Sequence, residues 1–175
     1  MKRLILTFAV IIAFAWTAQA QNAGNQTASG KWLIEANTGF GDMVAHGAST
    51  SFGLSSWDGM TIWSLGMEGG YFVMDDLALK VGLGYTDLDG FSMFSYKLGG
   101  KYYVASQIPI QVDLTGASIQ DAPENPLWLG IQGGYAIFLN DYVSLEPGLR
   151  YNISLNDQYS SEGAFELRIG FALHF

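Results

Sequence analysis

The sequence predicts an all-β protein: an eight-stranded antiparallel up-and-down transmembrane β-barrel. Three observations lead to this class. Large apolar residues alternate with small or polar ones along eight segments, glycine collects on the opposite face of the same segments, and the charges on that opposite face balance in sign. Alternation with period two is the pattern of strands that have two unlike faces. We therefore expect one apolar and one polar face around a closed sheet.

Residues 1–20 have the features of a secretory signal peptide. Two basic residues precede an apolar run over residues 4–16, and small residues at Ala18 and Ala20 suit a cleavage site. The run is too short to be a spanning helix, which needs roughly 20 apolar residues. We expect cleavage after Ala20 and export of the remaining chain.

The exported chain divides into a leader and one domain. Residues 21–30, "QNAGNQTASG", are small and polar and are predicted to form a flexible leader. Residues 31–175 suit one domain. The whole chain carries 16 acidic and 8 basic residues, a formal net charge of −8. This balance argues against nucleic-acid partners, which need a basic surface. The chain contains no cysteine, so the fold must hold without disulfides or a lipidated cysteine.

The connections between the alternating segments differ in length in a regular way. Short turns are expected at residues 75–76, 105–107 and 140–141, and longer connections at 43–59, 120–125 and 155–162, with 89–90 the exception. Short turns on one side and longer loops on the other are typical of membrane barrels with an even number of strands. Both chain ends then lie on the short-turn side. The eight segments are residues 31–42, 60–74, 77–88, 92–104, 108–117, 126–139, 142–154 and 163–175.

The size of the apolar side chains indicates which face looks inward. An eight-stranded barrel has an interior only just wide enough to be filled by side chains, and this many bulky groups would overfill it. The polar face instead carries most of the strand glycines, which suits a narrow interior. Aromatic residues near both ends of the strands, such as Trp32, Tyr71, Trp63 and Tyr85, suit the girdles at the two lipid–water boundaries. The apolar face is therefore expected to contact lipid.

The charges on the inward face are expected to form a network of ion pairs. Buried charges are tolerated when they are paired and hydrogen-bonded, and five basic residues here match five acidic ones. The predicted network consists of Glu35, Glu68, Lys80, Lys97, Lys101, Asp113, Glu146, Arg150, Glu166 and Arg168.

Two places fit the barrel pattern poorly. Pro147 lies on the lipid face of its strand and has no N–H for the sheet, so we expect a bulge or a locally weakened ladder there. The segment 108–117 loses its alternation after Leu114. Its upper part is expected to be bulged or to project beyond the membrane.

The final segment, "FELRIGFALHF" at 165–175, resembles the C-terminal strand of bacterial outer-membrane barrels, which ends on an aromatic residue. The hairpin "GGYFVMDDLALKVGLGY" at 69–85 is similar to those of the small barrel family that includes the OmpA and OmpX transmembrane domains. The resemblance implies a place in the outer membrane among its lipid and lipopolysaccharide, with periplasmic termini. It also implies periplasmic chaperones and the barrel-assembly machinery as partners. The assembly signal would be Leu167, Ile169, Phe171, Leu173 and Phe175. In contrast to OmpA, we expect no periplasmic domain after the barrel, so the resemblance does not imply tethering to peptidoglycan.

Signals for chemistry are weak. His46 lies in the longest loop with Ser49, Ser51 and Asp58, which invites a Ser-His-Asp hypothesis, but such a triad is defined by geometry rather than proximity in sequence. His174 is expected at the opposite rim, too far away to cooperate. No metal site or cofactor is expected from this His and Cys content. The motif "DLDG" at 87–90 is interpreted as a turn, and the "GFG" and "GLG" motifs as small interior positions, because no helix follows them.

Three classes of function remain open from the sequence. The preferred one is a non-enzymatic surface barrel, an adhesion or envelope-stability scaffold whose external loops meet an unknown ligand. The second is a small pore or conduit, which paired charges in the interior would obstruct. The third is a lipid A-modifying enzyme that uses the loop with Ser49 and His46.

Overall fold

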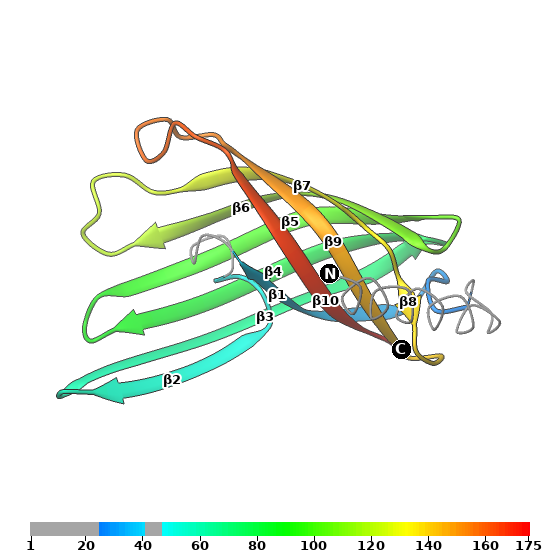
Figure 1. The fold of residues 1–175 in the computed structure, drawn as a ribbon, viewed down its shortest axis with the longest axis horizontal. Helices are drawn as coiled ribbons and strands as arrows, with labels where there is room; N and C mark the ends of the chain where they lie inside the picture. Colours follow the sequence, from blue (N-terminus) through cyan, green and yellow to red (C-terminus); the bar gives the residue numbers. More distant parts are fainter. Residues whose placement is uncertain (1–24, 41–46) are drawn as a thin grey trace, which may run out of the picture.

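The computed structural model describes residues 25–40 and 47–175, which fold into one closed antiparallel sheet (Figure 1). The signal peptide, residues 21–24 of the leader and His46 lie outside the described residues. The strands are β1 (Trp32–Phe40), β2 (Ser51–Trp57), β3 (Met60–Met74), β4 (Leu77–Leu88), β5 (Ser92–Val104), β6 (Ile108–Ile119), β7 (Leu127–Gly134), β8 (Ile137–Phe138), β9 (Val143–Ser154) and β10 (Ala164–His174).

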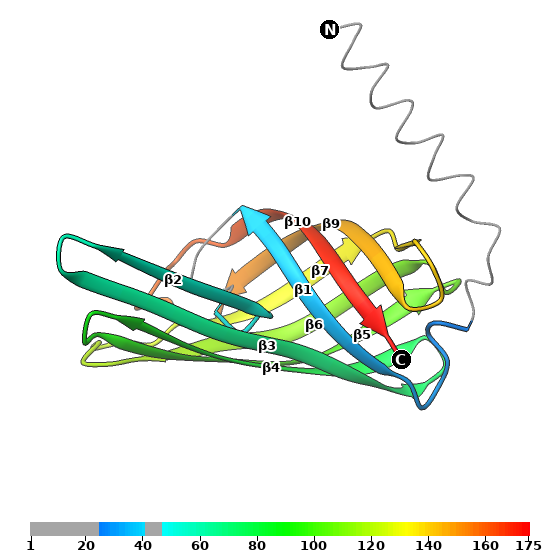
Figure 2. The same ribbon diagram turned by 90° about the horizontal axis from the view of Figure 1, so that it is seen from below.

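Eight staves form the barrel wall, as the sequence predicts. β7 and β8 together make one stave because both pair with β9, and β2 is an addition at the edge of β3. Closure joins the first strand to the last: β1 pairs with β10 from Leu33–His174 to Phe40–Leu167. Figure 2 shows β1 and β10 side by side along the wall. Within the described residues, no helix is long and apolar enough to cross a bilayer.

Strand β2 corrects the prediction that residues 43–59 form a long connection without a strand of their own. It forms a hairpin with β3, from Ser51–Gly66 to Trp57–Met60. The turn is Asp58-Gly59, with φ of 50° and 82°. Both values lie in the left-handed region that a two-residue type I′ hairpin turn requires, and Asp-Gly is among the preferred sequences for it. Serine and glycine dilute the alternation of β2, which hid the strand from the sequence pattern.

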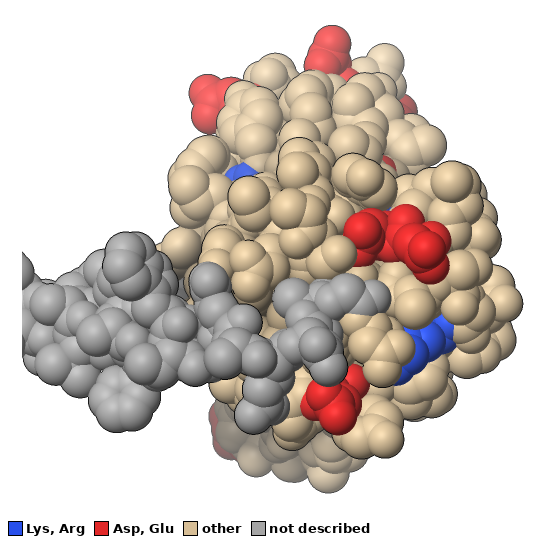
Figure 3. Space-filling view, turned by 90° about the vertical axis from the view of Figure 1, so that its right-hand side faces the viewer, with Lys and Arg blue, Asp and Glu red and all other residues tan. Residues whose placement is uncertain are grey.

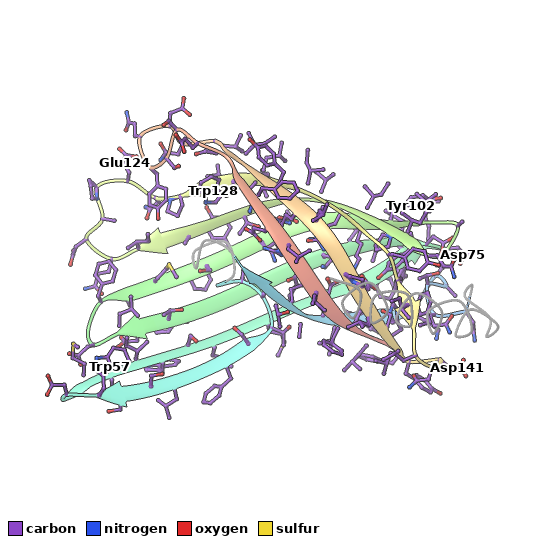
Figure 4. All side chains as sticks on the ribbon, viewed as in Figure 1. Trp57, Asp75, Tyr102, Glu124, Trp128 and Asp141 are labelled. Carbon is purple, nitrogen blue, oxygen red and sulfur yellow. The ribbon has the colours of Figure 1, made fainter. Side chains whose placement is uncertain are left out.

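The two faces of the wall are oriented as predicted. The large apolar residues of each stave point outward and are exposed, whereas the residues between them are buried in the interior. Aromatic pairs mark the two rims: the rings of Trp32 and Tyr71 lie 5.0 Å apart at the short-turn end, and those of Trp63 and Tyr85 lie 5.2 Å apart toward the other end. In Figure 4, Trp57 lies at the long-loop end and Asp75 at the short-turn end. The molecule is an eight-stranded transmembrane β-barrel with a continuous apolar belt.

The ladder is interrupted opposite Pro147, as the missing N–H predicts. β7 ends at Gly134 and β8 begins at Ile137, although both keep the same register on β9. Tyr135 donates its N–H to the Pro147 carbonyl at 3.0 Å, but the next N–H, that of Ala136, donates to the Gln107 carbonyl in the β5–β6 turn at 2.7 Å. The β5–β6 turn therefore supplies the acceptor for the Ala136 N–H, which has no partner within the sheet.

β6 stays regular where a bulge was one of the expectations. It pairs with β5 without a register shift from Val104–Ile108 to Met93–Ile119. The alternation fades because Gly116 stands at a lipid-facing position, where the ring of Tyr96 covers it: a Cβ at Gly116 would lie 2.5 Å from the Tyr96 hydroxyl oxygen. The Tyr96 side chain on β5 thus covers the surface where Gly116 of β6 has no side chain.

The orientation of the wall can be tested with spin labels, since the chain has no native cysteine. A label at Leu98→Cys on the apolar belt should be accessible to oxygen dissolved in the bilayer and shielded from a water-soluble paramagnetic reagent. A label at Gln158→Cys, in the connection between β9 and β10, should show the opposite preference. Equal access of the water-soluble reagent to both labels would contradict the outward-facing belt.

Candidate functional site in the barrel interior

The ten residues of the predicted network all lie in the interior, and every one is buried. The strands place them there because each occupies an inward position of the period-two pattern. Glycines at neighbouring inward positions leave room for the long side chains: a Cβ at Gly130 would lie 1.8 Å from a terminal nitrogen of Arg150.

Lys80 lies at the centre of the network. Its ammonium group is 2.8 Å from Glu35 Oε2, 2.8 Å from Glu68 Oε1 and 2.8 Å from the amide oxygen of Gln111. Lys97 lies 2.9 Å from the other oxygen of Glu68. These groups come from five strands, β1, β3, β4, β5 and β6, so the polar contacts link distant parts of the wall across the interior.

A second group extends toward the long-loop end. Arg150 donates from both terminal nitrogens to the two oxygens of Asp113, each at 2.6 Å, and Thr115 and Gln111 also donate to that carboxylate. Asn152 accepts from Arg150 Nε at 2.7 Å and donates to Glu166. Arg168 donates from Nε to the second oxygen of Glu166 at 2.8 Å. A two-pronged arginine–carboxylate contact fixes orientation as well as charge.

A third group extends toward the short-turn end. Lys101 bridges Glu35, at 2.9 Å, and Glu146. Tyr103 and Ser144 both donate to the other oxygen of Glu146 at 2.9 Å. The three groups are continuous through Gln111 and Glu35, so one polar network occupies the middle of the barrel.

An apolar layer that the period-two pattern does not predict lies between the charges and the short-turn end. The ring of Phe72 is 5.9 Å from that of Tyr103 and 6.1 Å from that of His174, and Phe138 lies 5.6 Å from the same imidazole. These rings occupy inward positions next to outward apolar residues, as in Tyr71-Phe72-Val73, so the local alternation is lost at the ends of the strands. This loss of alternation is the feature of the sequence from which the interior apolar layer could have been predicted.

Part of the leader caps this layer. Thr27 accepts from the N–H of Asp76 through its carbonyl at 2.8 Å and donates from its hydroxyl to the carboxylate of Asp76. The imidazole Nδ1 of His174 lies 3.1 Å from the carbonyl of Gln26. Both Gln26 and Thr27 are buried. Residues 25–30 are therefore docked on the barrel, where the sequence suggested a flexible segment. Figure 3 views this end, whose surface is mostly uncharged with both acidic and basic side chains on it.

A segment of the β1–β2 connection enters the interior on the side of the network toward the long-loop end. Ala48 and Ser49 are buried, and Lys97 donates to the Ser49 hydroxyl at 3.2 Å. The backbone of Gly47 lies so close to Gly84 that a Cβ there would be 1.7 Å from the Gly47 carbonyl oxygen. The inward glycines of β3 and β4 thus receive a loop, a use that the sequence did not reveal.

The other residues of the Ser-His-Asp hypothesis are placed elsewhere. Asp58 is the first residue of the β2–β3 turn, and Ser51 begins the exposed β2, where its hydroxyl donates to the Ser49 carbonyl at 3.2 Å. Ser49 is thus engaged with a lysine inside the barrel while Asp58 lies at the hairpin tip. The placement of His46 is outside the described residues.

The other motifs noted in the sequence can also be located in the structure. Asp87 accepts from the N–H of Gly90 at 3.3 Å, which makes "DLDG" a turn. Among the described residues, no group of three or more His, Cys, Asp or Glu side chains is arranged to hold a metal ion. The residues of the suggested assembly signal lie on β10 or directly after it, and all of them are exposed on the lipid-facing side: Leu167, Ile169, Phe171, Leu173 and Phe175.

Comparison with known proteins supports the fold. No family model matches the sequence, and no curated protein matches it. The structure is similar to the N-terminal β-barrel domain of OprF from Pseudomonas aeruginosa, with a TM-score of 0.52 and 15% identity over 84% of this chain and 98% of that chain. OprG from the same organism gives a TM-score of 0.49 and 13% identity over 86% and 98% of the two chains. The likeness to OprF places the chain among barrels with the fold of bacterial outer-membrane proteins.

The contribution of the interior ion pairs can be measured with Arg150. Arg150→Ala should lower the free energy of unfolding by about 3–5 kcal/mol, because it leaves the buried Asp113 carboxylate without its arginine. Urea unfolding of the refolded protein in lipid, followed by gel mobility and tryptophan fluorescence, measures the change.

The matched control is Asp157→Ala in an exposed connection, which should change stability by less than about 0.5 kcal/mol. The double variant Arg150→Ala/Asp113→Ala should recover part of the loss because the stranded carboxylate is gone. Equal unfolding midpoints for Arg150→Ala and Asp157→Ala would contradict an interior held by ion pairs.

Proposed function

We propose that the protein is an integral outer-membrane barrel that acts as a non-enzymatic scaffold and presents its long-loop end to the outside for adhesion or envelope integrity. The closed interior carries this proposal. The ion-pair network, the apolar layer below it, the docked leader and the segment Gly47–Ser49 together occupy the barrel along its length. A barrel whose interior is occupied in this way is rigid and offers no open path for solutes.

The proposed orientation follows from the connections. The short turns and the described part of the leader would face the periplasm, and the hairpin β2–β3 with the other long connections would face outward. The residues Leu167, Ile169, Phe171, Leu173 and Phe175 would be read by the barrel-assembly machinery after delivery by periplasmic chaperones. Once folded, the apolar belt would contact phospholipid and, in the outer leaflet, lipopolysaccharide.

The tip of the β2–β3 hairpin is the best candidate for an adhesive surface. It lies beyond the Trp63–Tyr85 pair, which marks the lipid boundary, yet Trp57 is 51% exposed and Met60 is 42% exposed. Apolar groups exposed to water beside polar ones mark interaction sites. The charged side chains described in the connections and at the strand end here are all acidic, so the partner surface is expected to be apolar with neutral or basic surroundings. These residues are Asp58, Asp87, Asp89, Asp121, Glu124, Asp157 and Glu162.

Planar bilayers test the scaffold against a pore. Purified refolded protein should give no stable single-channel steps in salt solution, because paired charges and Gly47–Ser49 fill the interior. Insertion is verified by heat-modifiable gel migration of the same sample. Reproducible conductance steps from inserted protein would overturn the scaffold proposal in favour of a channel.

Adhesion is tested with the barrel in lipid nanodiscs over immobilised fibronectin, laminin and collagen. The wild-type protein should bind at least one of them, and Trp57→Ser/Met60→Ser should weaken that binding by about tenfold or more, since each lost apolar contact costs about 1.5–3 kcal/mol. Glu162→Gln in the β9–β10 connection is the control and should bind as the wild type does. Absence of binding to all three, or equal binding by the tip variant, counts against adhesion through the hairpin.

A further inference from the structure

An apolar groove crosses the outer face of the barrel where β1 meets β3 and β4. Gly69 forms its floor. This glycine occupies a lipid-facing position, with Ile34 and Val81 paired to it on the two neighbouring strands. Along β3 its neighbours on the same face are Met67 and Tyr71, so a depression one residue wide is surrounded by large side chains. The walls of the groove include Trp32, Ile34, Met67, Tyr71, Val81 and Phe175.

The groove coincides with the narrowest pairing in the barrel wall. β1 and β3 are paired only at Trp32–Tyr71, Leu33–Gly70 and Ile34–Gly69, after which the upper part of β3 pairs with β2 instead. A Cβ at Gly69 would lie 3.2 Å from the Leu33 carbonyl oxygen, so glycine also allows the two strands to approach closely. The close approach deepens the groove.

The position of the groove identifies the molecules that can reach it. It belongs to the apolar belt, which faces the hydrocarbon of the membrane, so acyl chains are its immediate surroundings. Its end at the short-turn rim is bordered by Trp32, Tyr71 and Phe175, and aromatic side chains favour the headgroup level. An acyl chain in the groove would gain dispersion contacts on several sides, which a flat barrel surface does not offer.

A basic group stands at the same rim. Lys31 precedes Trp32 and is partly exposed. The nearby acids of the β3–β4 turn are already engaged: Asp75 accepts from the N–H of Ser29 at 2.8 Å, and Asp76 accepts from the hydroxyl of Thr27. A lysine at a membrane boundary can extend its ammonium group to the headgroups. The rim thus offers a positive group for a lipid phosphate next to an apolar channel for the chain.

We propose that this groove binds one phospholipid from the leaflet at the short-turn end, with an acyl chain over Gly69 and the phosphate near Lys31. The proposal rests on the barrel's position in a membrane and is independent of adhesion through the outer hairpin. A lipid held at the β1–β3 junction would cover the stretch of wall with the fewest strand pairs.

Native mass spectrometry of the refolded barrel, extracted from vesicles of phosphatidylethanolamine and phosphatidylglycerol into mild detergent, tests the proposal. The wild-type protein should retain one phospholipid. Gly69→Leu fills the floor of the groove and should lose it, and Val81→Trp, which fills the groove from β4 without touching the β1–β3 backbone, should lose it too. Lys31→Gln should weaken retention while leaving the apolar groove intact.

Gly133→Leu is the matched control. Gly133 is another glycine on the lipid-facing side, between Ile110 and Leu149, and a Cβ there meets nothing within 4 Å. This variant should keep the phospholipid. Retention by Gly69→Leu and Val81→Trp equal to that of the wild type would overturn the proposal, as would a lipid-free wild type. A wild type that instead appears as a dimer, with the monomer restored by both groove variants, would assign the groove to a second copy of the chain.

Discussion

The pairing of buried charges across the interior is the constraint on which the rest of the structure depends. A barrel of eight staves must fill its own lumen, and this chain fills the middle of it with lysine, arginine and carboxylate groups. Each carboxylate that is buried without a cation would cost several kcal/mol, so the strands must bring matching residues to the same depth. Lys80 illustrates the result, because it lies 2.8 Å from carboxylates of both β1 and β3. The register of the wall and the order of the charges along each strand therefore determine one another.

Most of the barrel wall could be predicted from the sequence because the surrounding lipid restricts which residues the outward positions can carry. Outward positions that meet the hydrocarbon must carry apolar or small side chains, and closure must satisfy each strand edge. All eight staves were thus predicted within a few residues of their observed ends, and Pro147 marked the break between β7 and β8 through its missing N–H. The added strand β2 escaped detection because serine and glycine carry little periodic signal. The Asp58-Gly59 turn held the stronger clue.

The interior was predictable in composition but only partly in arrangement. Period two placed all ten charged residues on the inward face, yet it does not specify which partners meet across the lumen. The link from Arg150 through Asn152 to Glu166, for example, depends on the stagger of β9 and β10. The segment Gly47–Ser49 was beyond reach for a different reason: a loop can fold inward or outward with the same sequence pattern, and only the glycines of β3 and β4 show that space was reserved for it.

The docking of Gln26 and Thr27 has a consequence for the order in which the molecule assembles. One set of their contacts comes from the hairpin of β3 and β4, and the other comes from His174 at the end of β10. These two elements are neighbours only after the first and last staves have joined. Gln26 and Thr27 can therefore make both sets of contacts only in the closed barrel, so their docking marks completed closure.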